Sequence, residues 1–160
     1  MRRRSLLALL GLAAFTRPAF TRPALAQTGP QPRLPMEPLA IITRDGKRHE
    51  FRVEMAVSPE QQRVGLMFRP SVKPDEGMLF DWGVPRESSM WMQNTITSLD
   101  MVFIREDGRI HRIAERTVPL SLATIDSRGL VRATLELAAG TAERLNLRPG
   151  DKVEHRIFEQ

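Results

Sequence analysis

The residues best suited to chemistry lie close together in the middle of the chain. Trp91 offers an indole donor, Asn94 an amide, Thr95 a hydroxyl and Asp100 a carboxylate. Such groups could converge on a small polar ligand, with the apolar run around Met78 as the pocket wall. The alternative is that the amide, the hydroxyl and the carboxylate only satisfy backbone groups in turns. We predict a ligand-binding site formed by Met78, Trp91, Met92, Asn94, Thr95 and Asp100.

A substitution series follows from this prediction. We expect Trp91→Ala to damage the protein through loss of packing, because a large aromatic ring usually carries much buried area. We expect Asn94→Ala and Asp100→Ala to leave a folded domain, because a ligand site contributes little to the core.

Methionines form a second pattern around the same tryptophan. Met90 and Met92 are two residues apart, so on a strand they would share one face while Trp91 points to the other. Thioethers bind Cu(I), and an indole can cover a cation. Small periplasmic copper carriers combine such residues with a histidine, but no histidine lies between His49 and His111. Methionine more often fills gaps in a core, so we expect no metal and no cofactor, and copper carriage is an alternative.

Patterns typical of enzymes are weak. The chain has no cysteine, which excludes cysteine nucleophiles, thiolate zinc sites and disulfides. The three histidines alternate with charged residues, as on a solvated surface. We therefore favour a non-catalytic domain. The alternative is a hydrolase of envelope carbohydrate, which would need two carboxyls about 5–10 Å apart across a cleft. The candidate acids are Asp75, Glu76, Asp81 and Asp100.

The positive charge of the chain is concentrated at its start. The net charge is +5, but five of the 24 basic residues and none of the acids lie in residues 1–26, so 19 basic residues face 19 acids in the remainder. A protein that follows a phosphate backbone needs a surplus of basic charge. We therefore expect no nucleic-acid partner.

The first 26 residues have the three parts of an export signal. Arg2–Arg4 form a positive start, residues 6–15 an apolar run, and Ala24-Leu25-Ala26 a small-x-small cleavage site. The run is too short to span a bilayer, and Arg3-Arg4-Ser5-Leu6-Leu7 resembles the twin-arginine motif. We expect a periplasmic or secreted protein without stable membrane insertion after cleavage. Its partner would be a small molecule, an envelope glycan or an envelope protein.

After the signal, residues 27–38 hold four prolines and predict an extended linker, which leaves one folded domain at 39–160. Asp45-Gly46 and Asp107-Gly108 predict two hairpins, and Ser58-Pro59 with Gln61 predicts a capped helix to about Phe68. Further strands are expected at 77–80, 89–92, 133–137 and 153–158, and a helix at 141–147. The fold class is therefore α+β, a small single domain whose mainly antiparallel sheet is curled or barrel-like and carries two short helices.

Several motifs occur together in the order typical of one family. They include Glu76-Gly77-Met78-Leu79-Phe80, Met90-Trp91-Met92-x-Asn94-Thr95 and Leu135-Glu136-Leu137. Over roughly residues 51–155 the chain resembles the family known as domain of unknown function 192 (DUF192). The resemblance implies a compact α+β domain with a barrel-like sheet, commonly preceded by an export signal. It implies no established biochemical role.

Overall fold

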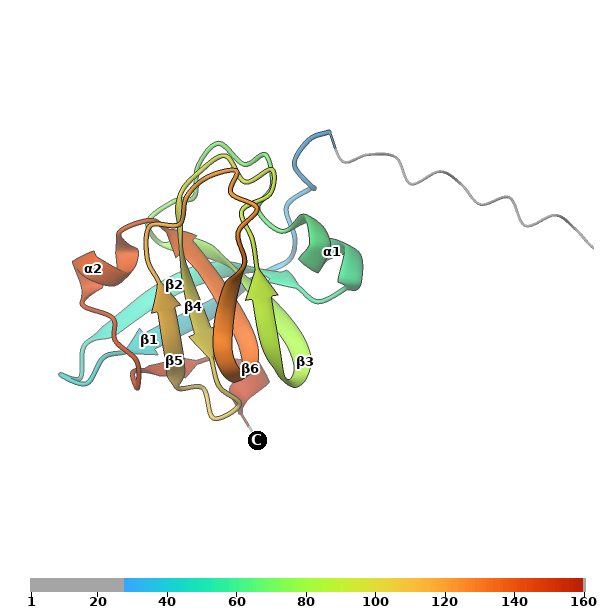
Figure 1. Ribbon diagram of the computed structural model, residues 1–160. Helices are drawn as coiled ribbons and strands as arrows, with labels where there is room; N and C mark the ends of the chain where they lie inside the picture. Colours follow the sequence, from blue (N-terminus) through green and yellow to red (C-terminus); the bar gives the residue numbers. More distant parts are fainter. Residues whose placement is uncertain (1–27, 160) are drawn as a thin grey trace, which may run out of the picture.

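The computed structural model describes residues 28–159, so the expected signal peptide lies outside the described residues. Seven strands and two short α-helices form one α+β domain (Figure 1), which confirms the predicted fold class. In chain order the elements are β1 (Met36–Ile42), β2 (Arg48–Ala56), α1 (Pro59–Val64), β3 (Glu76–Met90), β4 (Leu99–Ile104), β5 (Ile110–Ala114), β6 (Ile125–Ala138), α2 (Thr141–Leu145), β7 (Lys152–Glu154) and a final 3-10 turn, Arg156–Phe158.

The sheet is mainly antiparallel and curls until its two edges meet. The strand order is β5-β4-β6-β3-β2-β1-β7, and only β2 and β3 run parallel. The residue before β5, Arg109, forms a bridge with Lys152 of β7. Backbone hydrogen bonds extend this contact, since Ile110 donates to Asp151 over 2.9 Å and Val153 donates to Gly108 over 2.7 Å. The curled sheet therefore closes on itself at this end.

Both faces of the curled sheet are buried over its central strands. One face encloses a core to which all seven strands contribute, including Leu79 and Leu135. The opposite face carries a second apolar cluster, which includes Met78 and Met101 and continues into Leu66 and Met92 outside the sheet. Every residue of β4 is buried, which is typical of a strand covered on both faces.

The predicted turns and the predicted helix cap are present, but several strands and helices begin or end at other residues than predicted. Ser58 and Gln61 form the capping box, yet α1 ends at Val64 because Gly65 takes a φ of 50°. The two strands predicted at 77–80 and 89–92 belong largely to one strand, β3. A shift of register between Asp81 and Arg86 accommodates Gly83 and Pro85 within this strand. At the other end β7 stops at Glu154, and β1 already begins inside the predicted linker.

Candidate functional site

Most of the predicted site residues lie on the loop between β3 and β4, which pairs with the loop between β5 and β6. Met92 N–H donates to Ser121 O, and Leu120 N–H donates to Thr95 O, each over 3.0 Å. Near the start of β4, Thr117 N–H donates to Leu99 O over 2.8 Å. Loops 91–98 and 115–124 therefore form one hydrogen-bonded unit, at the upper end of the molecule in Figure 1.

Asp100 lies in β4, fully buried, and both of its carboxylate oxygens bind backbone amides. Oδ1 accepts from Arg116 N–H and Oδ2 from Ala142 N–H, each over 2.8 Å. The residue before α2, Gly140, offers no side-chain cap, so Asp100 satisfies an amide of the first turn from outside the helix. Its carboxylate thus joins loop 115–124 to α2.

Asn94 and Thr95 also bind their surroundings. Asn94 has a φ of 55°, its carbonyl accepts from Phe68 N–H over 2.8 Å, and its Nδ2 lies 3.8 Å from Met67 Sδ. The Thr95 hydroxyl is buried and donates to Gln93 O over 3.3 Å. A left-handed φ is unusual for a residue other than glycine, and asparagine tolerates it well. The polar groups of this loop therefore shape a turn.

The remaining three predicted residues differ in how far they are buried. Met78 and Met92 are completely buried, and Met92 Sδ accepts a hydrogen bond from the Thr117 hydroxyl over 3.2 Å. Trp91 is 47% exposed. The structure thus brings the six residues into one region but presents Trp91 to solvent and uses most of the others internally. Their role in ligand binding stays a prediction.

The paired loops also present apolar side chains that the sequence analysis missed. Large aliphatic residues of loops 91–98 and 115–124 are 48% to 68% exposed and join Trp91 in what we call the loop surface: Trp91, Ile96, Val118, Leu120 and Leu122. The available signal is the alternation of Val118, Leu120 and Leu122 with other residues, which resembles a strand. No strand forms there, because Leu120 takes a φ of 62°.

Glu136 is a second residue that the sequence analysis did not single out. It lies in β6 between Met78 of β3 and Met101 of β4 in the strand register, on the face of the second apolar cluster. It is only 5% exposed, and its carboxyl has no hydrogen-bond partner within residues 28–159. Burial raises its pKa to about 8. The alternation Leu135-Glu136-Leu137 would suit a strand whose Glu136 side faces solvent, but in β6 this side is covered by the second apolar cluster.

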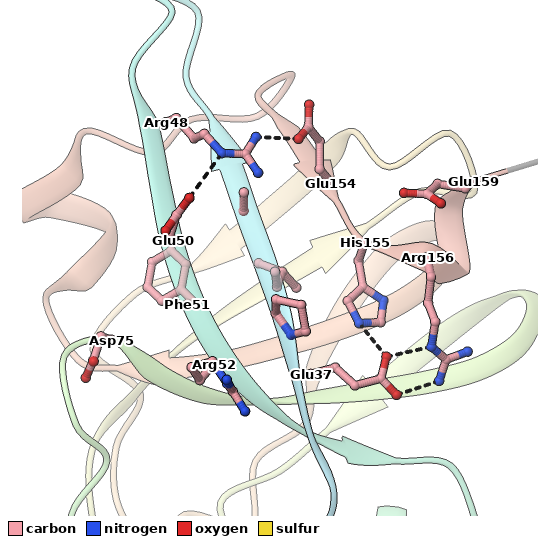
Figure 2. Close-up of a pocket in the computed structure, with 13 residues that line it drawn as sticks. Glu37, Arg48, Glu50, Phe51, Arg52, Asp75, Glu154, His155, Arg156 and Glu159 are labelled. Carbon is pink, nitrogen blue, oxygen red and sulfur yellow. Dashed lines mark hydrogen bonds and ion pairs between the residues drawn. The ribbon is translucent and has the colours of Figure 1, made fainter.

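A groove of about 580 Å³ lies across β1, β2, β7 and the final turn (Figure 2). Arg48 binds Glu154 over 2.5 Å at one end, and at the other Arg156 binds Glu37 through two bonds of 2.5 and 2.7 Å. These bonds hold the pKa of Glu37 below its usual range, while burial lowers the pKa of His155, whose Nε2 lies 3.1 Å from the same carboxylate. Ion pairs thus occupy both ends of the groove, and its lining holds five carboxylates and three guanidinium groups.

The acids considered for hydrolysis have different surroundings. Asp75 lines this groove, Asp81 pairs with Arg132, and Glu76 pairs with Arg33 and Lys73.

The described residues contain no group of three or more histidine, aspartate or glutamate side chains that could hold a metal ion. Between residues 28 and 159, no helix has the length and apolar character needed to cross a membrane.

Comparison with known proteins agrees with the resemblance seen in the sequence. The family model of DUF192, described as "Uncharacterized ACR", matches residues 40–155. No curated protein sequence matches the chain.

Two solved structures are similar. A protein from Sinorhizobium meliloti 1021, described as a candidate transcription regulator, is 47% identical with a TM-score of 0.77, over 79% of this chain and 98% of its own. A protein of unknown function from Novosphingobium aromaticivorans DSM 12444 is 38% identical with a TM-score of 0.74, over 76% of this chain and 86% of its own.

Proposed function

The chain belongs to the DUF192 family, and we propose that this member is an exported, non-catalytic domain that binds a partner protein through the loop surface. The observation that carries the proposal is the gathering of Trp91 and four aliphatic side chains, each about half or more exposed, on two paired loops. Contiguous exposed apolar surface on a small domain marks an interaction site. Tryptophan is also among the residues most enriched at the energetic centres of protein interfaces.

A protein partner fits this surface better than a small ligand or a glycan. Binding of a small polar molecule needs free polar groups that fix its orientation. Both Asp100 oxygens are bound to backbone amides, and the Thr95 hydroxyl donates within its own turn. What the loops leave open to a partner is mainly apolar area.

The loop surface is also held in place before any partner binds. Main-chain hydrogen bonds join the two loops at Met92 and Leu120, and a third joins Phe68 to Asn94. A pre-organised surface loses less conformational freedom on binding. The left-handed backbone of Leu120 stores strain, which is common at functional positions.

Photo-crosslinking in cells that naturally produce the protein tests the proposal. A benzoyl-phenylalanine at position 96 should give a discrete adduct with one other protein, and the same group at position 130 should not. Leu130 is a matched control, because it is 63% exposed but lies in β6 outside the loop surface. Equal adducts from both positions, or no adduct from position 96, would contradict the proposal.

Leu120→Asn then separates binding from folding. Asparagine enters the left-handed region more readily than leucine, so the variant should melt at the same or a higher temperature. Loss of the apolar side chain should remove most of the adduct from position 96, whereas Leu130→Asn should leave it unchanged. If Leu120→Asn keeps the adduct at full yield, the loop surface is not the binding site.

A further inference from the structure

A second hollow, of about 340 Å³, lies between the end of β5, the start of β6 and loop 115–124. Its volume is within the range of small-molecule sites. Three guanidinium groups line it, together with two carboxylates and the hydroxyls of the loop. What distinguishes the hollow is how few of these cations have an anionic partner.

The side chain of Arg112, on β5, is held by contacts other than an ion pair with a carboxylate. Its Nη1 donates to the backbone carbonyl of Asp126 over 2.8 Å, and its guanidinium lies 5.6 Å from the centre of the Phe103 ring. It forms no ion pair with any residue of the described part of the chain. Burial lowers its pKa and the charge of Arg128 lowers it further, while the charge of Asp126 offsets part of this shift. The two cations therefore lie close enough to repel each other.

Arg128, in β6, lines the same hollow and has a left-handed backbone. Its φ is 58°, and its side chain has no hydrogen bond or ion pair within the described residues. The next residue, Gly129, has a φ of 156°, and a Cβ there would lie 2.7 Å from His111 Nε2, so a larger residue would be strained. Left-handed backbone at a residue other than glycine persists where the surrounding structure enforces it, and such positions cluster at binding sites.

Two of the other charged side chains at the hollow already have partners. Arg116 pairs with Glu143, and the Asp126 carboxylate accepts from the Ser89 hydroxyl over 2.5 Å. Glu115 is exposed. An anion entering the hollow would therefore relieve the repulsion between Arg112 and Arg128.

We propose that Arg112 and Arg128 form a binding site for an oxyanion, the phosphate or carboxylate group of a small molecule. Guanidinium groups match both anions through paired, charge-assisted hydrogen bonds. The site adjoins the loop surface at Val118 but does not depend on the partner-binding role proposed above.

The test is an NMR titration of the ¹⁵N-labelled protein with inorganic phosphate and, separately, with succinate at constant ionic strength. The Nε–Hε signals of Arg112 and Arg128 should shift and saturate with at least one of these probes. Arg128→Gln should weaken the affinity at least tenfold. The Arg128 side chain forms no hydrogen bond or ion pair within the described residues, so the variant should stay folded. Arg144→Gln removes one positive charge from an exposed position of α2 and should bind as the natural protein does.

The outcomes separate the possible sources of a shift. Saturation with phosphate alone identifies a phosphate site, and saturation with succinate alone a carboxylate site. Shifts that do not saturate, or that weaken equally in Arg144→Gln and Arg128→Gln, show general charge screening and overturn the proposal. Leu120→Asn should bind the anion normally, so failure of partner binding and failure of anion binding can be told apart.

Discussion

At the scale of single residues, the buried carboxyl of Glu136 should make stability depend on pH. Burial raises its pKa in the folded protein to about 8 from the usual 4.5. Between these values the folded state keeps a proton that the unfolded chain has lost, so stability falls as the pH rises. At pH 7 the raised pKa lowers the free energy of unfolding by on the order of 3 kcal/mol. Glu136→Gln keeps the shape without the charge, so its advantage in melting temperature should grow from pH 5 to pH 8.

Exposed Glu143 provides the control, since Glu143→Gln should melt in parallel with the natural protein over the same range. Parallel curves for Glu136→Gln as well would show that Glu136 does not titrate in this window.

Residue type alone could identify Trp91 and Asp100 as notable, but their burial reverses the expected substitution series. Trp91 is 47% exposed and Asp100 fully buried, so Asp100→Ala should damage the fold more than Trp91→Ala.

At the scale of elements, the segment before β1 is bound to the domain. Leu34 N–H donates to Glu54 Oε2 over 2.8 Å, and Arg69 donates to the same oxygen over 3.1 Å and to Gln31 O over 3.2 Å. Glu54→Ala should therefore leave the largely buried guanidinium of Arg69 without its carboxylate partner. The free energy of unfolding, measured in urea, should fall by about 3–5 kcal/mol. Hydrogen exchange at the Leu34 amide should accelerate. Glu143→Ala, which breaks the exposed pair with Arg116, should cost less than about 1 kcal/mol; an equal cost for both would contradict this account.

Local chemistry explains which elements the sequence could predict. The turn at Asp45-Gly46 and the capping box at Ser58 depend on neighbouring residues alone, and both occur as predicted. The exposed side chains of loop 115–124 could not be predicted, because they depend on how that loop pairs with residues 91–98. The length of β3 likewise depends on its pairing with β6, which carries the strand past Gly83 and Pro85.

At the scale of the whole molecule, closure between β5 and β7 should be part of the cooperative unit. Asp151 is buried at this closure, and its carboxylate accepts from Arg44 N–H over 3.1 Å and from Arg148 N–H over 2.7 Å. Asp151→Ala should lower the free energy of unfolding by about 2–4 kcal/mol, because two backbone amides lose a charged acceptor. Exchange should accelerate at the amides of Ile110 and Val153 together.

The matched control lies at the same end of the sheet. Asp107 is exposed and accepts from Arg109 N–H over 3.0 Å, so Asp107→Ala should cost less than about 1 kcal/mol. If Asp151→Ala speeds exchange only around residues 148–153 and leaves urea unfolding unchanged, the closing contact opens independently of the sheet. A single transition at lower urea would instead show that the curled sheet needs both of its edges joined to hold the two apolar clusters, and with them the loop surface, in place.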